Sequence, residues 1–132
     1  MAYCTLSDVQ SLFANVVFDA ASPVSDAEIE TVHIPTATAY IDARLRPVYA
    51  LPITASTDLE LLRLIAMHLV AGIVAEILYE TSSHPNEQAS ARRHREWAEG
   101  ILDRLLRGEM ALEAERISLV NAGVFGEDGL EG

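Results

Sequence analysis

The residues that could do chemistry are few, and their spacing does not match a catalytic or metal-binding pattern. Glu30 and His33 form one E-x-x-H pair, but a di-iron bundle needs two such pairs and two further glutamates. The other histidines, His68, His84 and His94, form no H-x-x-x-H zinc pattern. The chain also contains no glycine-rich phosphate loop and no G-x-S-x-G sequence. We therefore expect no enzyme activity, no metal and no cofactor.

Two single residues have ordinary structural interpretations. His68 lies in an apolar segment, where we expect a hydrogen-bonded core histidine rather than a ligand for a metal or a small molecule. Cys4 is the only cysteine, so the chain forms no internal disulfide.

The charge of the chain argues against general nucleic-acid binding. Twenty acidic residues face nine basic ones, all of them arginine, and the formal net charge is −11. A surface of that sign repels polyphosphate and keeps a free subunit soluble. We expect DNA to bind weakly and without sequence preference, if at all.

A basic cluster near the C-terminal end is the one feature that suggests a phosphate site. It contains Arg92, Arg93 and Arg95. Acidic residues follow or precede arginines at helical neighbour spacing, which predicts ion pairs within one helix. We therefore favour a solvated, self-neutralised face, with the expected pairs Arg92–Glu96, Arg95–Glu99 and Asp103–Arg107.

Four helices are expected to position these residues, which predicts an all-α fold, a small helical bundle. Capping signals open the first three helices, and Gly108 ends the fourth. The expected helices begin at Thr5 with Asp8 three residues later, run from Ser25 (with Glu28) to about Arg46, run from Thr57 (with Glu60) to about Tyr79, and run from Pro85 or Asn86 to Gly108.

The third predicted helix is apolar nearly all round, so we expect it to be the core helix. Its longest uncharged apolar run, Leu64 to Ala75, is shorter than the roughly 20 residues that span a bilayer. The first residues, MAYCTLSDVQ, lack the basic start and the apolar run of a secretory signal. We expect a protein that is cytosolic or released from a cytosol, without a membrane partner.

The second predicted helix carries two apolar stripes, and one domain rarely needs to bury both. The inner stripe contains Ile34, Ala37, Ile41 and Leu45, whereas the outer stripe contains Ile29, Val32, Thr36, Ala39, Tyr40 and Ala43. Pro35 should kink this helix because it lacks a backbone donor. Two interpretations stay open. The outer stripe contacts another subunit, or the kink lets the helix wrap around its own core.

The chain changes character after the fourth helix. We assign residues 1–112 to the helical domain and residues 113–132 to an extended C-terminal arm that ends in an acidic tail. The stretch from Ile117 to Phe125 is β-prone, and we expect it to order only against partners. The arm residues predicted to bind a partner are Ile117, Leu119, Val120, Val124 and Phe125.

The run ATAYIDARLRPVYALPI, from Ala37, resembles the signature of small head–tail connector proteins of tailed bacteriophages, the Mu-like head-completion or adaptor group. The matching positions are Ala37 or Ala39, Ile41, Asp42, Leu45, Tyr49, Leu51 and Pro52. The opening Tyr3-Cys4-Thr5 with Asp8 is similar to the start of that family, and the end of the fourth helix is similar to its close at Arg95, Ala98, Leu102, Gly108 and Leu112. The chain departs from the family in Pro35 and in its longer tail.

The resemblance implies a structural virion protein at the head–tail neck, assembled in the host cytoplasm. Such a subunit forms a ring, commonly of twelve copies, beneath the portal protein and offers a surface to the tail or a stopper protein. DNA would pass through the channel without specific binding. In this interpretation Asp42 and Tyr49 hold the junction between the second predicted helix and the connector, the extended segment Val48 to Ser56 that follows it. The arm reaches a neighbour or the portal.

An alternative of a different class stays open. A small cytosolic helical module that binds or regulates one protein partner would show the same composition and helices.

Overall fold

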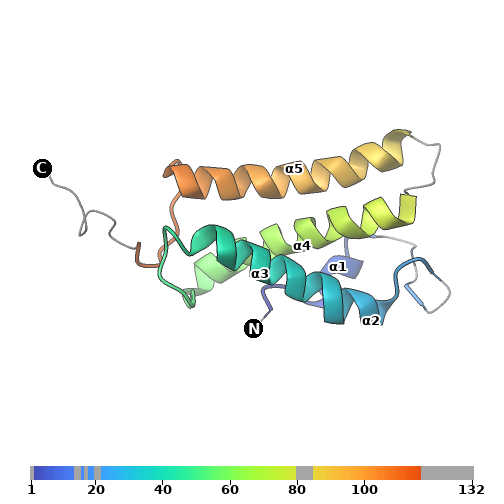
Figure 1. The fold of residues 1–132 in the computed structure, drawn as a ribbon, viewed down its shortest axis with the longest axis horizontal. Helices are drawn as coiled ribbons and strands as arrows, with labels where there is room; N and C mark the ends of the chain where they lie inside the picture. Colours follow the sequence, from blue (N-terminus) through green and yellow to red (C-terminus); the bar gives the residue numbers. More distant parts are fainter. Residues whose placement is uncertain (1, 14–15, 17, 20–21, 80–84, 117–132) are drawn as a thin grey trace, which may run out of the picture.

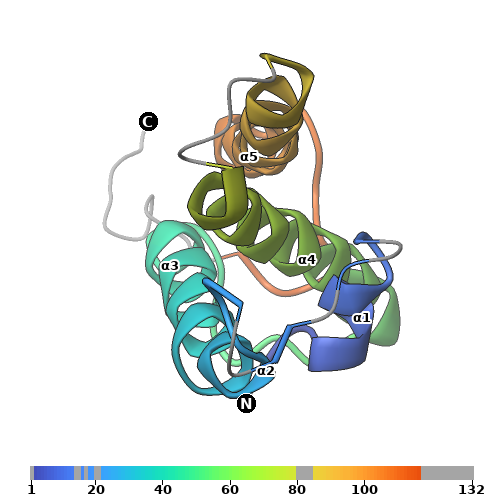
Figure 2. The ribbon, with the colours of Figure 1, turned by 90° about the vertical axis from the view of Figure 1, so that its right-hand side faces the viewer.

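The computed structural model describes residues 2–13, 16, 18–19, 22–79 and 85–116, and this part of the chain is all-α, as predicted. The helices are α1 (Leu6–Gln10), α2 (Asp26–Glu28), the single π-helical turn η1 (Ile29–His33), α3 (Ile34–Leu45), α4 (Ser56–Tyr79) and α5 (Pro85–Arg107). Figure 1 shows α4 in the middle, with α5 along one side and α3 along the other. Figure 2 shows that α1 packs on the part of α4 that α5 leaves open.

The central helix α4 is apolar on most sides, and this explains its position. Its buried residues include Leu62, Ile65, Val70 and Val74, which lie in different directions around the axis. By length and composition α4 could cross a membrane, since its most apolar window has a mean hydropathy of 2.0. In this domain 56% of that window is buried against the other helices, as in the core helix of a globular bundle.

The close packing of α4 on α5 depends on a glycine. A Cβ atom placed on Gly72 would lie 3.3 Å from the backbone oxygen of Ala91 and 3.3 Å from the Cβ atom of Arg95. Both contacts are shorter than the usual van der Waals separation of carbon atoms. Gly72 therefore permits the two helices to approach at this level.

The second predicted helix is interrupted where Pro35 requires it. The Ile34 N–H donates to the Ile29 carbonyl, a π-type hydrogen bond between residues five apart. Pro35 lies in the first turn of α3, directly after this π-type turn, so the residue that lacks a backbone N–H coincides with the change in the hydrogen-bond pattern. The inner stripe is buried as predicted, with Ile34, Ala37, Ile41 and Leu45 at most 3% exposed.

The helix ends agree with the sequence in most places. Thr5 and Asp8 form the predicted reciprocal capping box of α1, and the Ser25 hydroxyl accepts the Glu28 N–H. Gly108 adopts a φ of 81° after α5, the left-handed conformation of a helix stop. The Glu109 N–H then donates to the Arg104 carbonyl at 2.9 Å, which completes the Schellman pattern.

The predicted cap of the third helix is wrong. The helix begins at Ser56, and the Leu59 N–H donates to the Ala55 carbonyl, so Thr57 already lies within the first turn. Its hydroxyl donates to the Glu113 carboxylate, while Glu60 pairs with Arg63. Thr57 and Glu60 therefore bind other side chains instead of capping the helix. The spacing of residues within one helix could not predict the contact with Glu113, which lies far away in the sequence.

Residues 112–116 form a strap that returns from the end of α5 across the start of α4. The Tyr49 hydroxyl accepts the Leu112 N–H at 3.2 Å, and Tyr49 is fully buried. The Ala50 N–H donates to the Glu115 carbonyl at 2.9 Å, beside an isolated antiparallel bridge between Tyr49 and Arg116. The strap therefore ties the connector after α3 to the C-terminal segment.

Asp58 holds the middle of the strap. Its side chain is 4% exposed, and its two oxygens accept the backbone N–H groups of Glu113 and Ala114 at 2.7 and 2.8 Å. These bonds fasten the first residues of the predicted arm, 113–116, to the helical domain. Residues 117–132 lie outside the described residues.

Candidate interaction surfaces

The outer face of η1 and α3 is available to a partner, with one exception. Val32 and Tyr40 are 48% and 37% exposed, and Thr36, Ala39 and Ala43 are exposed too. We call these five residues the outer helix face. It offers small and apolar side chains on a well-anchored helix.

Ile29 is the exception and corrects the sequence prediction. It is fully buried in the core of the same chain, so it is not available to a partner. In a regular α-helix Ile29 and Ile34 would point about 140° apart. The π-type turn instead places residues five apart on nearly the same side, and Ile29 joins Ile34 in the core.

Tyr40 has a second role, because its hydroxyl belongs to a polar network between α3 and α5. It donates to Glu99 at 2.6 Å, and Arg44 donates to both Tyr40 and Glu99 at 2.6 Å. The other arm of the Arg44 guanidinium reaches Asp103 at 2.6 Å. Burial first, and then the bond to Glu99, raise the pKa of Tyr40.

This network corrects the expected pattern of ion pairs within α5. Glu99 and Asp103 pair with Arg44 of α3, Arg95 pairs with Glu76 of α4, and Arg107 pairs with Glu109. Glu99, Asp103 and Arg95 thus join α5 to another helix, whereas Arg107 pairs with a residue just past the end of α5. The expected pair Arg92–Glu96 is not formed among the described residues either.

A cluster of aromatic rings joins α4 and α5. His68 Nδ1 lies 2.9 Å from His94 Nδ1, and the His68 ring centroid is 4.6 Å from that of Trp97. His68 is hydrogen-bonded, as predicted, with another histidine as its partner, but it is only half-buried and does not belong to the core. Burial lowers the pKa of both histidines, and each is further lowered by a neighbouring positive charge, His94 for His68 and Arg93 for His94.

The two residues that resemble the connector family at the end of α3 have structural contacts. Asp42 accepts the hydroxyl of Tyr3, and burial together with this bond raises the pKa of Tyr3. Thr38 lies one turn earlier, and its hydroxyl accepts the Tyr3 N–H at 3.2 Å. Asp42 therefore fastens the N-terminal segment to α3, while Tyr49 fastens the strap.

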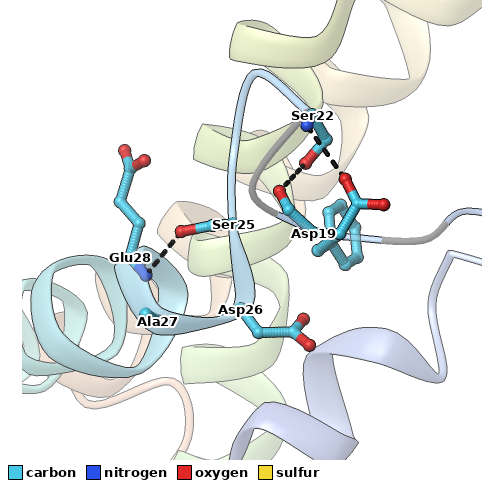
Figure 3. A pocket seen from close by; sticks show the side chains of 7 residues that line it. Asp19, Ser22, Ser25, Asp26, Ala27 and Glu28 are labelled. Atoms are coloured by element: carbon cyan, nitrogen blue, oxygen red, sulfur yellow. Dashed lines mark hydrogen bonds between the residues drawn. The ribbon is translucent and has the colours of Figure 1, made fainter.

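A shallow pocket of about 540 Å³ lies before and around the start of α2. Figure 3 shows the Asp19, Asp26 and Glu28 carboxylates pointing in different directions. The Ser25 hydroxyl is engaged by the Glu28 N–H, and Asp26 accepts the Gln10 side-chain amide at 3.1 Å. Among the described residues no group of three or more His, Cys, Asp or Glu side chains could hold a metal ion.

Comparison of the chain with protein-family models, with curated proteins and with solved structures finds no match. The surfaces must therefore be interpreted from their own geometry. Sequence reasoning located the outer helix face but missed Asp58 and the partners of Arg44. One feature of the sequence pointed to Asp58. It is an acidic residue in the first turn of a mostly apolar helix, and a carboxylate that is buried with such a helix needs hydrogen-bond donors.

Proposed function

We propose that this chain is a structural subunit that assembles with copies of itself into a ring, as a head–tail connector of a tailed bacteriophage. The observation that carries the proposal is the outer helix face. Its exposed small and apolar residues lie along two to three turns of helix and are not covered within the described chain. In a closed ring each subunit contacts its neighbours through two different patches, and the outer helix face can supply one of them.

The anchoring of this face supports a role in assembly. α3 is held from behind by Ile41 and Leu45 in the core, and from the side by Arg44 through Glu99 and Asp103. A surface held this firmly loses little conformational entropy when a neighbour docks. In a ring beneath a portal, the acidic subunit would let DNA slide through the channel.

The proposal is tested by measuring self-association of two variants that add the same charge at different places. Ala39→Glu places a carboxylate on the outer helix face, whereas Ser7→Glu adds the same charge on the exposed side of α1. Ala39 is a better test site than Tyr40, because the Tyr40 hydroxyl also contributes to the network with Glu99.

Light scattering after size exclusion, over a concentration series, should show ring-sized particles for the wild type and for Ser7→Glu. Ala39→Glu should stay monomeric with an unchanged melting temperature. A wild-type chain that stays monomeric at every concentration, and also when mixed with the portal protein of its own genome, would refute the proposal.

A further inference from the structure

One side of α5 carries an exposed stripe of two arginines and a tryptophan. Arg93, Trp97 and Arg104 follow one another at helical spacings of four and seven, which places them within about 40° around the axis. Trp97 is 41% exposed, and both arginines are exposed. We call these three residues the Arg–Trp stripe.

The stripe is separated from the acidic side of the same helix. Glu96, Glu99 and Asp103 lie on the other flank of α5, and the last two face Arg44 of α3. None of the ion pairs between described residues includes Arg93 or Arg104. In a chain of net charge −11, two guanidinium groups that form no ion pair among the described residues lie beside an exposed indole, and together they form a distinct local site.

The floor of the stripe is aromatic. The Trp97 ring packs over His68, which in turn bonds to His94. A segment that lies on this surface would therefore meet an apolar ring system between two cationic side chains. The chemistry that fits is a short peptide with apolar side chains and several carboxylates, because guanidinium groups bind carboxylates in bidentate pairs.

This chain itself contains such a peptide. The sequence from residue 117 to 132 carries the acids Glu127, Asp128 and Glu131 together with the apolar residues Phe125 and Leu130. We propose that the Arg–Trp stripe binds the acidic C-terminal segment, residues 117–132, of a second copy of this chain. The inference deepens the proposed ring and rests on it, since it names the surface on which the arm of one subunit docks.

The anchoring of the strap favours a second copy over the same chain. After Gly108 the chain leaves α5 (Figure 1), and the strap of residues 112–116 then crosses to the connector, where Arg116 lies beside Tyr49. The segment beyond Arg116 therefore begins beside the connector and not beside α5. Sixteen further residues reach at most about 55 Å when extended, whereas Arg93 and Arg104 are only about 16 Å apart along the helix. The segment is long enough to span the stripe of an adjacent subunit.

Trp97 provides the readout, because it is the only tryptophan of the chain. The receptor is the full chain with its own tail neutralised by Glu127→Gln, Asp128→Asn and Glu131→Gln, so that its tail does not compete. A synthetic peptide of residues 117–132 is titrated into it while Trp97 emission is recorded. The expected result is a saturable emission shift that weakens as salt is added.

Two controls make the test specific. A peptide with the same three neutralising changes should bind at least tenfold more weakly, and so should the native peptide on a receptor with Arg93→Gln and Arg104→Gln. Equal responses in either control, or no response to the native peptide, would refute the docking. A single-stranded oligonucleotide that binds more tightly than the peptide would refute it as well.

Peptide binding, oligomeric state and the effect of the tail on Trp97 emission together separate this inference from the proposed ring. If the wild type forms rings but the peptide does not bind, the docking fails and the ring stands. If the peptide binds while the wild type stays monomeric, the proposed ring is wrong, and the Arg–Trp stripe binds the segment although no ring forms. If neutralising the tail shifts Trp97 emission in monomers, at a dilution where light scattering shows single chains, the segment docks within its own chain and the second-copy assignment is wrong.

Discussion

Asp58 and Glu113 are 55 positions apart in the sequence, yet the Asp58 carboxylate accepts the backbone N–H of Glu113 at 2.7 Å. The second oxygen of the same carboxylate accepts the N–H of the next residue, Ala114. One buried side chain thus fixes where the C-terminal segment leaves the domain. That position decides which subunit the segment can reach.

The Asp58→Asn variant should lower the free energy of unfolding by about 1–3 kcal/mol, because one backbone donor would face an amide NH₂ in a buried site. Urea unfolding followed by circular dichroism measures the effect. Glu60→Gln is the matched control, since Glu60 lies two residues away and is exposed, and water screens its pair with Arg63, so the change should affect stability much less than Asp58→Asn does. Equal stability of the two variants would show that the strap contributes nothing.

Two C-terminal truncations that differ by only four residues should differ in their free energy of unfolding. A chain that ends at Arg116 keeps every described contact of the strap, so we expect it to unfold at the same urea concentration as the full chain. A chain that ends at Leu112 leaves the buried Asp58 carboxylate without its two donors, and it should lose at least about 2 kcal/mol. If the shorter chain is as stable as the longer one, Asp58 is satisfied by water instead.

Stability should fall as the pH drops below about 6.5 because of the His68–His94 pair. Burial lowers the pKa of both histidines in the folded state below the ordinary value of 6.5. As the pH falls, the unfolded chain therefore binds protons before the folded chain does. The free energy of unfolding then decreases until the pH reaches the lowered pKa values of the folded state. Thermal melts between pH 7.5 and about 5 should show this slope in the wild type and in His33→Gln. The double variant His68→Gln with His94→Gln should flatten it, and an unchanged slope would assign the effect to other groups.

Gly100 inside α5 and Gly108 just after it should respond in opposite directions to replacement by alanine. Gly108→Ala forces a side chain into a φ of 81°, so it should cost about 1 kcal/mol. Gly100→Ala should stabilise the chain by about 0.5–1 kcal/mol, because Gly100 lies inside the helix and an added Cβ would meet nothing within 4 Å. Denaturation midpoints of the two variants test the assignment. A loss of stability in Gly100→Ala would mean that its environment is closed.

The amino-acid sequence by itself determined the helical class, the buried stripe of α3, the central place of α4 and the stop at Gly108. Each of these depends on residues within about four positions of one another, where helical periodicity and capping act. The outer helix face was also visible in this way, apart from Ile29. A rule based on a regular helix could not place Ile29, because the π-type turn before Pro35 changes the direction of the residues that precede it.

Only the tertiary structure decided which charges meet. Glu99 has Arg95 at neighbour spacing along α5, yet it pairs with Arg44 of α3, because the packing of α3 beside α5 brings that guanidinium within 2.6 Å. The same holds for Asp58, whose donors arrive only after α5 has returned the chain to the start of α4. Local sequence offers each charged side chain several equivalent partners, and the packing of the helices chooses among them.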